Sequence, residues 1–198
     1  MDATPDAPTL RERTRRAVRA EITDTALRLF AEQGFDATTV DQIAAAAGIS
    51  RRSFFHYFGS KEDVVLGDLE ALGLRVREAL EARPAAETSW EALREAFKSL
   101  QGPDTDAASE LQIAGMYADA PSLRARHLEK HLRWQELLAP DIERRLGITP
   151  GPTADHRARA VIAAALACLD TAVEAWRASG GTADLVQLFD EAVAAVRA

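Results

Sequence analysis

The side chains best suited to chemistry stand together between residues 38 and 61. Arg51, Arg52 and Ser53 directly follow Ser50, a residue type that often caps the start of a helix, so all three are expected in a first helical turn. From such a turn an arginine can bridge guanine O6 and N7 in the DNA major groove, which is worth ~1–3 kcal/mol of discrimination between bases. Alternatively, both arginines only neutralise phosphates.

Further polar side chains flank this turn. His56 lies three residues after Ser53 and therefore on the same helical face, where we expect a polar contact to DNA and not a pH switch. Tyr57, Lys61 and Thr39 are expected to bind phosphates, Lys61 with help from the helix that begins beside it. The predicted DNA-binding set is Thr39, Arg51, Arg52, Ser53, His56, Tyr57 and Lys61.

Three short helices are needed to position these groups. Apolar spacing predicts a first helix from about Arg11 to Gln33, which ends at Gly34. Thr39, with Gln42 three residues later, predicts a capped second helix, and Gly48 supplies the turn to the third. The second and third helices are predicted at Val40 to Ala47 and Arg51–Phe58, with Phe54 and Phe58 in the core and Phe55 either in the core or against the DNA backbone. This order of elements is a helix-turn-helix.

Charge is distributed unevenly along the chain. The net charge is -7, but residues 1–61 hold nine Lys and Arg against eight Asp and Glu, whereas the remainder holds fifteen against twenty-three. Since a local field steers a polyanion more than the total charge does, the acidic total does not exclude DNA.

Compartment and class follow from what the sequence omits. It has no run of ~18 uninterrupted apolar residues and no basic segment before an apolar one at its start, so we expect neither a membrane span nor a secretory signal. Its one cysteine, Cys168, cannot form an internal disulfide and suits a reducing cytoplasm. Residues 1–9 are expected to be disordered.

The rest of the chain also reads as helical. Helices are predicted at about residues 61–83, 89–101, 106–117, 122–146, 153–179 and 182–197, separated by Pro and Gly breaks. Strand-like alternation is absent. The sequence therefore predicts an all-α protein of about nine helices, a small reader followed by a helical bundle.

The segment from Ala26 to Val65 reads ALRLFAEQGFDATTVDQIAAAAGISRRSFFHYFGSKEDVV. With its Gly-Phe, Thr-Thr-Val, Ala-Gly-Ile-Ser and Gly-Ser-Lys-Glu steps, it resembles the tetracycline-repressor (TetR) family of bacterial transcription regulators. The resemblance implies a DNA-binding domain at residues 1–60 and a ligand-binding and dimerisation domain at residues 61–198. It also implies a cytoplasmic homodimeric repressor that binds a palindromic double-stranded DNA operator and is released by a small molecule.

The same resemblance places a ligand pocket among the later helices. Residues 121–140 and 164–181 look like an actinobacterial subgroup with acyl-CoA-like ligands. Few charges are expected to point inward, which favours a largely apolar ligand, although each candidate side chain can equally be core packing. The predicted ligand-binding residues are Phe97, Met116, Tyr117, Trp134 and Cys168.

A histidine pair raises the question of a metal. His127 and His131 stand at i, i+4, a spacing able to chelate an ion. Because Arg124, Arg126 and Lys130 surround them, we expect a solvated basic face and no metal; alternatively, these cations meet the phosphates of a CoA-like ligand.

Two final helices carry apolar stripes. One stripe runs from Val161 through Ala165, Cys168 and Ala172 to Trp176, and the other from Leu185 to Val196. We expect a homodimer through these two helices, the alternative being that the stripes close the chain's own core.

Enzyme signatures are missing from the sequence. There is no Gly-rich phosphate loop after a strand and no Gly-x-Ser-x-Gly, so neither catalysis nor a cofactor is expected. A ligand-responsive transcriptional repressor is the principal hypothesis. The alternatives are a helical-bundle enzyme or carrier with vestigial DNA binding, and a helix-turn-helix regulator without a small ligand.

Overall fold

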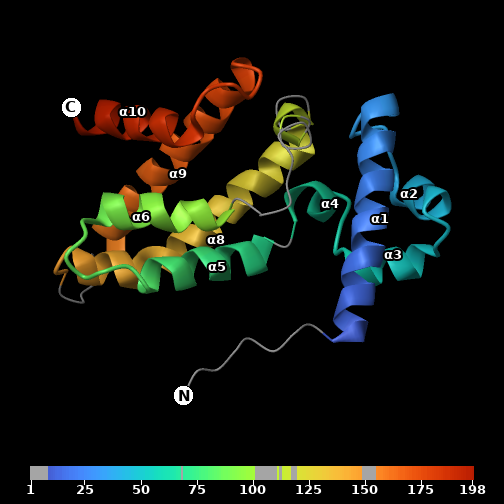
Figure 1. The fold of residues 1–198 in the computed structure, drawn as a ribbon, viewed down its shortest axis with the longest axis horizontal. Coiled ribbons are helices and arrows are strands. Elements are labelled where there is room, and N and C mark those ends of the chain that lie inside the picture. Colours follow the sequence, from blue (N-terminus) through green and yellow to red (C-terminus); the bar gives the residue numbers. More distant parts are fainter. Residues whose placement is uncertain (1–8, 68, 101–110, 112, 117–119, 149–154) are drawn as a thin grey trace. The chain divides into compact units, whose positions relative to one another are not determined.

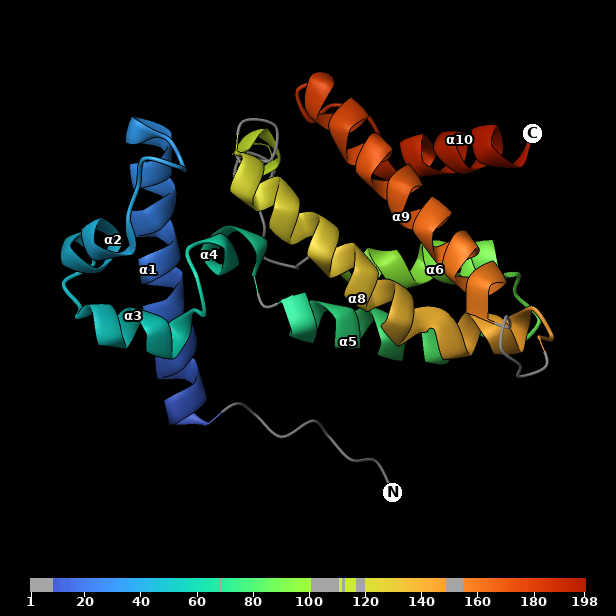
Figure 2. The same ribbon diagram turned by 180° about the vertical axis from the view of Figure 1, so that it is seen from behind.

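The computed structural model describes residues 9–67, 69–100, 111, 113–116, 120–148 and 155–198. They form two compact units, Met1–Gly67 and Asp68–Ala198, each built from helices (Figures 1 and 2). Within these described ranges no strand is present, which confirms the all-α class and the helix-turn-helix followed by a helical domain. No described helix has both the length and the apolar character that crossing a bilayer requires.

The first unit consists of α1 (Leu10–Gln33), α2 (Val40–Ala46), α3 (Arg51–Tyr57) and α4 (Glu62–Leu66). Its helix starts are fixed by local caps. The Thr39 side chain accepts a hydrogen bond from the Gln42 N–H, and the Gln42 side-chain oxygen accepts one from the Thr39 N–H, as the sequence predicts. Ser50 caps α3 by accepting from the Ser53 N–H at 3.0 Å. These caps set where α3 begins and therefore which side chains occupy its first turn.

Aromatic packing holds α3 against α1. Phe54 and Phe58 are buried, which confirms their predicted core role, whereas Phe55 is 45% exposed. Arg19 of α1 donates to the Tyr57 carbonyl at 3.1 Å and lies 4.5 Å from the Phe58 ring centre. Removing a ring such as Phe54 would cost about 3–5 kcal/mol, so α3 is held rigidly by its apolar face.

The link between the two units is not the continuous helix that the sequence predicts. A single helix over residues 61–83 was expected, but α4 ends at Leu66 and α5 begins at Leu69. Gly67 adopts φ 71° and ψ −164°, a conformation that side chains rarely tolerate and that ends a helix. The unit boundary accordingly follows Gly67 and not residue 60.

The second unit contains α5 (Leu69–Glu81), α6 (Ser89–Phe97), the 3₁₀ turn η1 (Lys98–Leu100), α8 (Pro121–Arg145), α9 (Asp155–Ala178) and α10 (Leu185–Arg197). Residues 113–116 are also helical. Helix α9 packs against α6, α8 and α10, and α5 packs against α6 and α8. Gly73 lets α5 approach α8 closely, because a Cβ there would lie 2.7 Å from the Trp134 indole nitrogen.

A buried ion pair fixes the far end of α8. Arg145 donates to the Asp141 carboxylate at 2.6 Å, and both side chains are about 5% exposed or less. The same guanidinium donates to the carbonyls of Leu80 and Arg83, at the end of α5. The Leu80 carbonyl also accepts from the Arg83 N–H at 3.1 Å, so Arg145 reinforces the turn that ends α5 while it anchors α8.

Candidate nucleic-acid interface and ligand cavity

The first turn of α3 presents polar side chains to solvent, but their partners differ. Arg52 and His56 are exposed. Arg51 is 62% exposed and pairs with Asp41 of α2, with 2.8 Å between Nη1 and Oδ2. The Ser53 hydroxyl lies 2.8 Å from the Ser50 hydroxyl. The structure therefore brings the predicted base-reading residues together, with Arg51 already held by a carboxylate.

Thr39 and Tyr57 occupy the two ends of this surface. Thr39 is exposed at the start of α2, where its side chain closes the capping box, and Tyr57 is half-buried at the end of α3. The His56 and Tyr57 rings meet edge-on, with centroids 5.4 Å apart. The phosphate contacts expected of Thr39 and Tyr57 stay a prediction.

The Lys61 ammonium forms its hydrogen bonds within the first unit. Its ammonium donates to the carbonyls of Phe35 at 2.8 Å, Thr38 at 3.0 Å and Asp36 at 3.4 Å, and it lies 4.4 Å from the Phe35 ring centre. An ammonium has three donors, and three carbonyls face it. Lys61 thus clamps the turn between α1 and α2, a role that the sequence analysis did not anticipate.

The second unit encloses a cavity of about 780 Å³. Its apolar wall comes from Phe97, Leu169, Val173, Trp176 and Phe189. The expectation of few inward charges is wrong, because seven of the nineteen described lining residues carry a formal charge, histidine not counted, and five of the seven are positive. The seven are Arg94, Lys98, Arg124, Lys130 and Arg177 against Asp170 and Glu174. Such a cavity suits a molecule with an apolar part and an anionic part.

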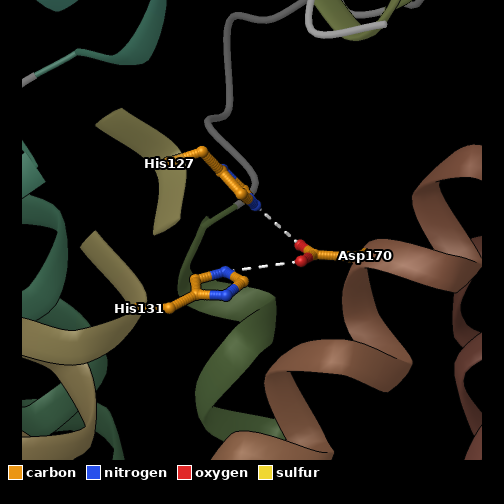
Figure 3. Close-up of side chains that lie close together, drawn as sticks. All are labelled: His127, His131 and Asp170. Atoms are coloured by element: carbon orange, nitrogen blue, oxygen red, sulfur yellow. Dashed lines mark hydrogen bonds and ion pairs between the residues drawn. The ribbon is translucent and has the colours of Figure 1, made fainter. Parts of the chain in front are cut away.

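A histidine–aspartate cluster forms part of one wall. His127 Nε2 lies 2.9 Å from one oxygen of Asp170, and His131 Nε2 lies 3.5 Å from the other (Figure 3). The His127 and His131 side chains are 21% and 12% exposed, so the expectation of a solvated face is wrong for this pair. Both rings face α9, and no local signal in α8 points to a carboxylate on that helix.

Burial shifts the protonation of two neighbours. It lowers the pKa of His131 to about 4, against the opposing effect of Asp170, and lowers the pKa of Lys130 to about 8. The Lys130 ammonium lies 3.2 Å from His127 Nδ1 and 4.9 Å from the Trp134 ring centre. His131 is therefore neutral at physiological pH, and the Lys130 ammonium is a stronger acid than an ordinary lysine, with a pKa just above physiological pH.

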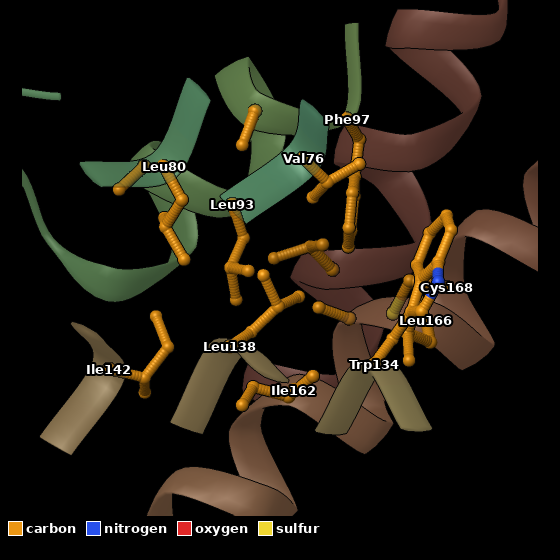
Figure 4. Packing of buried hydrophobic residues seen from close by; sticks show 14 of the residues in the cluster. Val76, Leu80, Leu93, Phe97, Trp134, Leu138, Ile142, Ile162, Leu166 and Cys168 are labelled. Carbon is orange, nitrogen blue, oxygen red and sulfur yellow. The ribbon is translucent and has the colours of Figure 1, made fainter. Parts of the chain in front are cut away.

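The four predicted ligand-binding residues that the structure describes do not all line the cavity. Phe97 lines the cavity. Trp134 and Cys168 are buried in the hydrophobic core of the unit (Figure 4), and burial raises the pKa of the Cys168 thiol. Met116 is half-buried and does not line the cavity, and Tyr117 lies outside the described residues. Apolar type predicted burial for these residues but could not separate core from cavity wall.

The apolar stripe on α9, expected to contact a second chain, lies largely in the core of this chain. Ala165, Cys168 and Ala172 belong to the core of the chain itself, as the alternative interpretation holds. Ala160, Ala167 and Ala175 are exposed on another face of the same helix. On α10, Phe189 is buried whereas Val196 is 59% exposed.

Comparison with known proteins shows the family of the chain. Residues 22–67 match the bacterial regulatory proteins of the tetR family, and residues 87–198 match the MftR C-terminal domain. The chain belongs to the TetR family of bacterial regulators. It is 34% identical over 168 residues to the HTH-type transcriptional regulator TcmR of Streptomyces glaucescens, which covers 81% of this chain and 74% of TcmR. It is also 30% identical over 156 residues to MftR of Mycobacterium tuberculosis, covering 78% and 77%.

A solved structure supports the same assignment. The TetR-family repressor FadR of Thermus thermophilus, in complex with lauroyl-CoA, superposes with a TM-score of 0.52 at 26% identity, covering 88% of this chain and 91% of FadR. Family membership and the helix-turn-helix identify this protein as a DNA-binding transcriptional regulator. Its relatives are named as regulators and not as enzymes.

Proposed function

We propose that this TetR-family regulator is a homodimeric repressor that binds a palindromic operator and is released by an amphipathic acyl-type anion. The observation that carries the proposal is the cavity, whose apolar wall adjoins cationic side chains. Arg94 and Lys98 are paired with Glu95 and Asp190 outside the lining, so Arg124, Lys130 and Arg177 are the cations proposed to meet an anion. A fatty acyl chain with a carboxylate, or a phosphate-bearing thioester, matches both parts. The lauroyl-CoA bound to the Thermus FadR supports this class of ligand.

The DNA side of the proposal rests on α3. Arg52 and His56 are exposed beside a helix start that family members use for reading, and Ser53 is half-exposed with them. A repressor with one such helix per chain reads two half-sites about one helical turn, ~34–36 Å, apart, which requires a two-fold assembly.

The assembly is proposed to use α9 and α10 of each chain. Exposed alanines on α9 permit close helix approach, and Val196 of α10 leaves apolar surface beside charged residues. The α9 residues that are buried in the chain's own core cannot also form this contact between chains. Exposed positions such as Ala167, and not the core positions Ala165 and Ala172, are therefore the proposed interface.

Release requires the ligand to bind the DNA-incompetent state better than the competent one. A tenfold release needs ~1.4 kcal/mol of differential affinity. Because Gly67 interrupts the connection between the units, the coupling is proposed to pass through the α4–α5 link and not along one continuous helix.

The test combines an operator with a blocked cavity. The operator is first selected from random duplexes, and its binding is followed by fluorescence anisotropy while lauroyl-CoA, lauric acid or free CoA is added. Lauroyl-CoA is expected to release the DNA, and free CoA is not. Val173→Trp fills the apolar wall and is expected to weaken release at least about tenfold while leaving operator affinity near wild type.

The matched control is Leu74→Trp, an equally bulky change at an exposed position of α5 that does not line the cavity. Release should persist in it. If Val173→Trp still releases DNA at the wild-type ligand concentration, the effector binds elsewhere. If no duplex is selected at all, the repressor assignment itself is wrong.

A further inference from the structure

The His127–His131–Asp170 cluster has the composition of a metal site. Two histidines one helical turn apart on α8 face a carboxylate from α9, and one candidate ligand atom from each residue lies within 4.8 Å of the other two. Two imidazoles and one carboxylate form a ligand set used by Zn²⁺ and by several other divalent transition metals. The two rings are stacked at an angle, with centroids 4.4 Å apart.

The spacing is close to what an ion needs. Ligand atoms bound at about 2.0–2.2 Å from Zn²⁺ lie roughly 3.0–3.5 Å apart. The two nitrogen–oxygen separations are 2.9 Å and 3.5 Å. The three ligand atoms lie within 4.8 Å of one another, so rotation of the Asp170 and His131 side chains suffices to reach this spacing, without moving either helix.

The positive side chains around the cluster differ in their partners. Two of the nearby cations are engaged elsewhere, whereas Arg124 and Lys130 line the cavity. Arg126 and Arg133 both pair with Glu129, at 2.6 Å and 2.7 Å. Lys130 remains at the site, beside His127 Nδ1.

We propose that His127, His131 and Asp170 bind one divalent transition-metal ion of the Zn²⁺ class on the α8–α9 wall of the cavity. His127 and Asp170 both line that cavity, so the remaining coordination positions are open to it and hold water. The site goes beyond the proposed release by an acyl-type anion, because it takes a ligand of a different chemical class.

Substituting Lys130 is expected to change metal affinity in the opposite direction to substituting a ligand. An ammonium 3.2 Å from His127 Nδ1 repels an incoming cation and favours the proton on Nε2, where the ion must bind. Removing the ammonium is therefore expected to strengthen metal binding. A purely structural histidine–aspartate contact would show no such effect.

The test uses the full, tag-free chain with Zn²⁺ in calorimetry and Co²⁺ as a visible-spectrum probe. Wild type is expected to bind one ion per chain. His131→Gln and Asp170→Asn should weaken binding at least about tenfold, and Lys130→Met should strengthen it by about tenfold near neutral pH. His156→Gln, an exposed histidine at the start of α9, is the matched control and should bind as wild type does.

Two results would overturn the site: no stoichiometric uptake by wild type, or unchanged affinity in both ligand variants. Circular dichroism reports whether those variants fold. If they do not, ¹⁵N spectra of the wild-type imidazoles decide. Zn²⁺ should then shift the Nε2 signals of His127 and His131 and leave His56 and His156 in place. Equal shifts at all four histidines would refute the site.

Discussion

The reading surface and the cavity are built in opposite ways. The reading surface comes from consecutive short helices whose caps, turn and core lie within residues 22–67. The cavity takes its walls from α6, η1, α8, α9 and α10, so residues such as Arg94 and Val186 that are far apart in sequence share one space. A local design can be recognised in a sequence, whereas a cavity exists only after the bundle has packed.

The two regions also treat charge differently. Arg51 and Arg52 stand in solvent, where a phosphate can replace water with little loss. In the second unit, Lys130 and His131 are buried against Asp170, and burial lowers the pKa of both. Exposed charge suits a partner that is itself highly charged, and buried charge suits selective recognition of one small ligand.

The largest expected effect separates core from interface on α9. Ala172→Glu places a carboxylate at a position that is 2% exposed inside the core and should destabilise the second unit by several kcal/mol. Ala167→Glu, one and a half turns away on the exposed face, should leave the fold intact and yield monomers that bind the operator weakly. Thermal unfolding and light scattering after size exclusion distinguish these outcomes.

A folded Ala167→Glu dimer with wild-type operator affinity would remove this face from the proposed interface. A folded Ala172→Glu protein would contradict the packing of α9 itself, because nothing else in the core can accommodate the carboxylate.

A smaller effect is expected within the first turn of α3. Arg52→Ala should relax base preference at one operator position by ~1–3 kcal/mol. Arg51→Ala should cost less, because Arg51 must first give up or share its 2.8 Å contact with Asp41. Binding to a panel of single-base operator variants measures both. Equal weakening on every sequence would show that these arginines contact only phosphates.

A structural feature could be predicted from the sequence when the residues that form it lie close together along the chain. The caps at Thr39 and Ser50 and the buried Phe54 were predictable because their partners lie within four residues or on one helical face. The break at Gly67 had a local signal as well, a glycine after Val-Val-Leu, but the continuing apolar pattern concealed it. The helices of the first unit can thus be predicted almost entirely from interactions between residues close in sequence.

The cavity was less predictable for a physical reason. Helical spacing shows that His127 and His131 share a face, but it cannot show that Asp170, on another helix, faces them. Likewise Trp134 and Phe97 are both large, apolar and buried in the same core, and only the tertiary packing of the helices makes Phe97 line the cavity as well. Partner identity, and not residue type, decides these roles.

Lys61 tests the boundary between a binding and a structural role. Lys61→Met removes the ammonium from three carbonyls and should lower the free energy of unfolding by about 1–3 kcal/mol. Because the ammonium is engaged, the salt dependence of DNA binding should change little. Denaturant titration and salt-dependent anisotropy measure the two effects. A slope reduced by about one unit would instead place Lys61 among the phosphate ligands.

The smallest expected effect is a pH dependence confined to the second unit. Burial, opposed by Asp170, lowers the pKa of His131 to about 4, whereas an unfolded histidine titrates near 6.5. Between these values the unfolded chain binds the extra proton, so the free energy of unfolding is maintained above pH 6.5 and falls as the pH drops towards 4. Since the His131 side chain is still partly exposed, we expect a loss of about 1–2 kcal/mol.

Comparing variants isolates this contribution from the carboxylates that protonate at lower pH. His131→Gln cannot gain the proton, so its stability should fall less than that of wild type between pH 6.5 and 4.5. His156→Gln, exposed at the start of α9, should follow the wild-type curve. Urea titrations across this range measure the difference. If His131→Gln falls as steeply as wild type, the buried cluster carries no proton-linked stability, and the contrast between a solvated reader and a buried, titrating cavity wall loses its support.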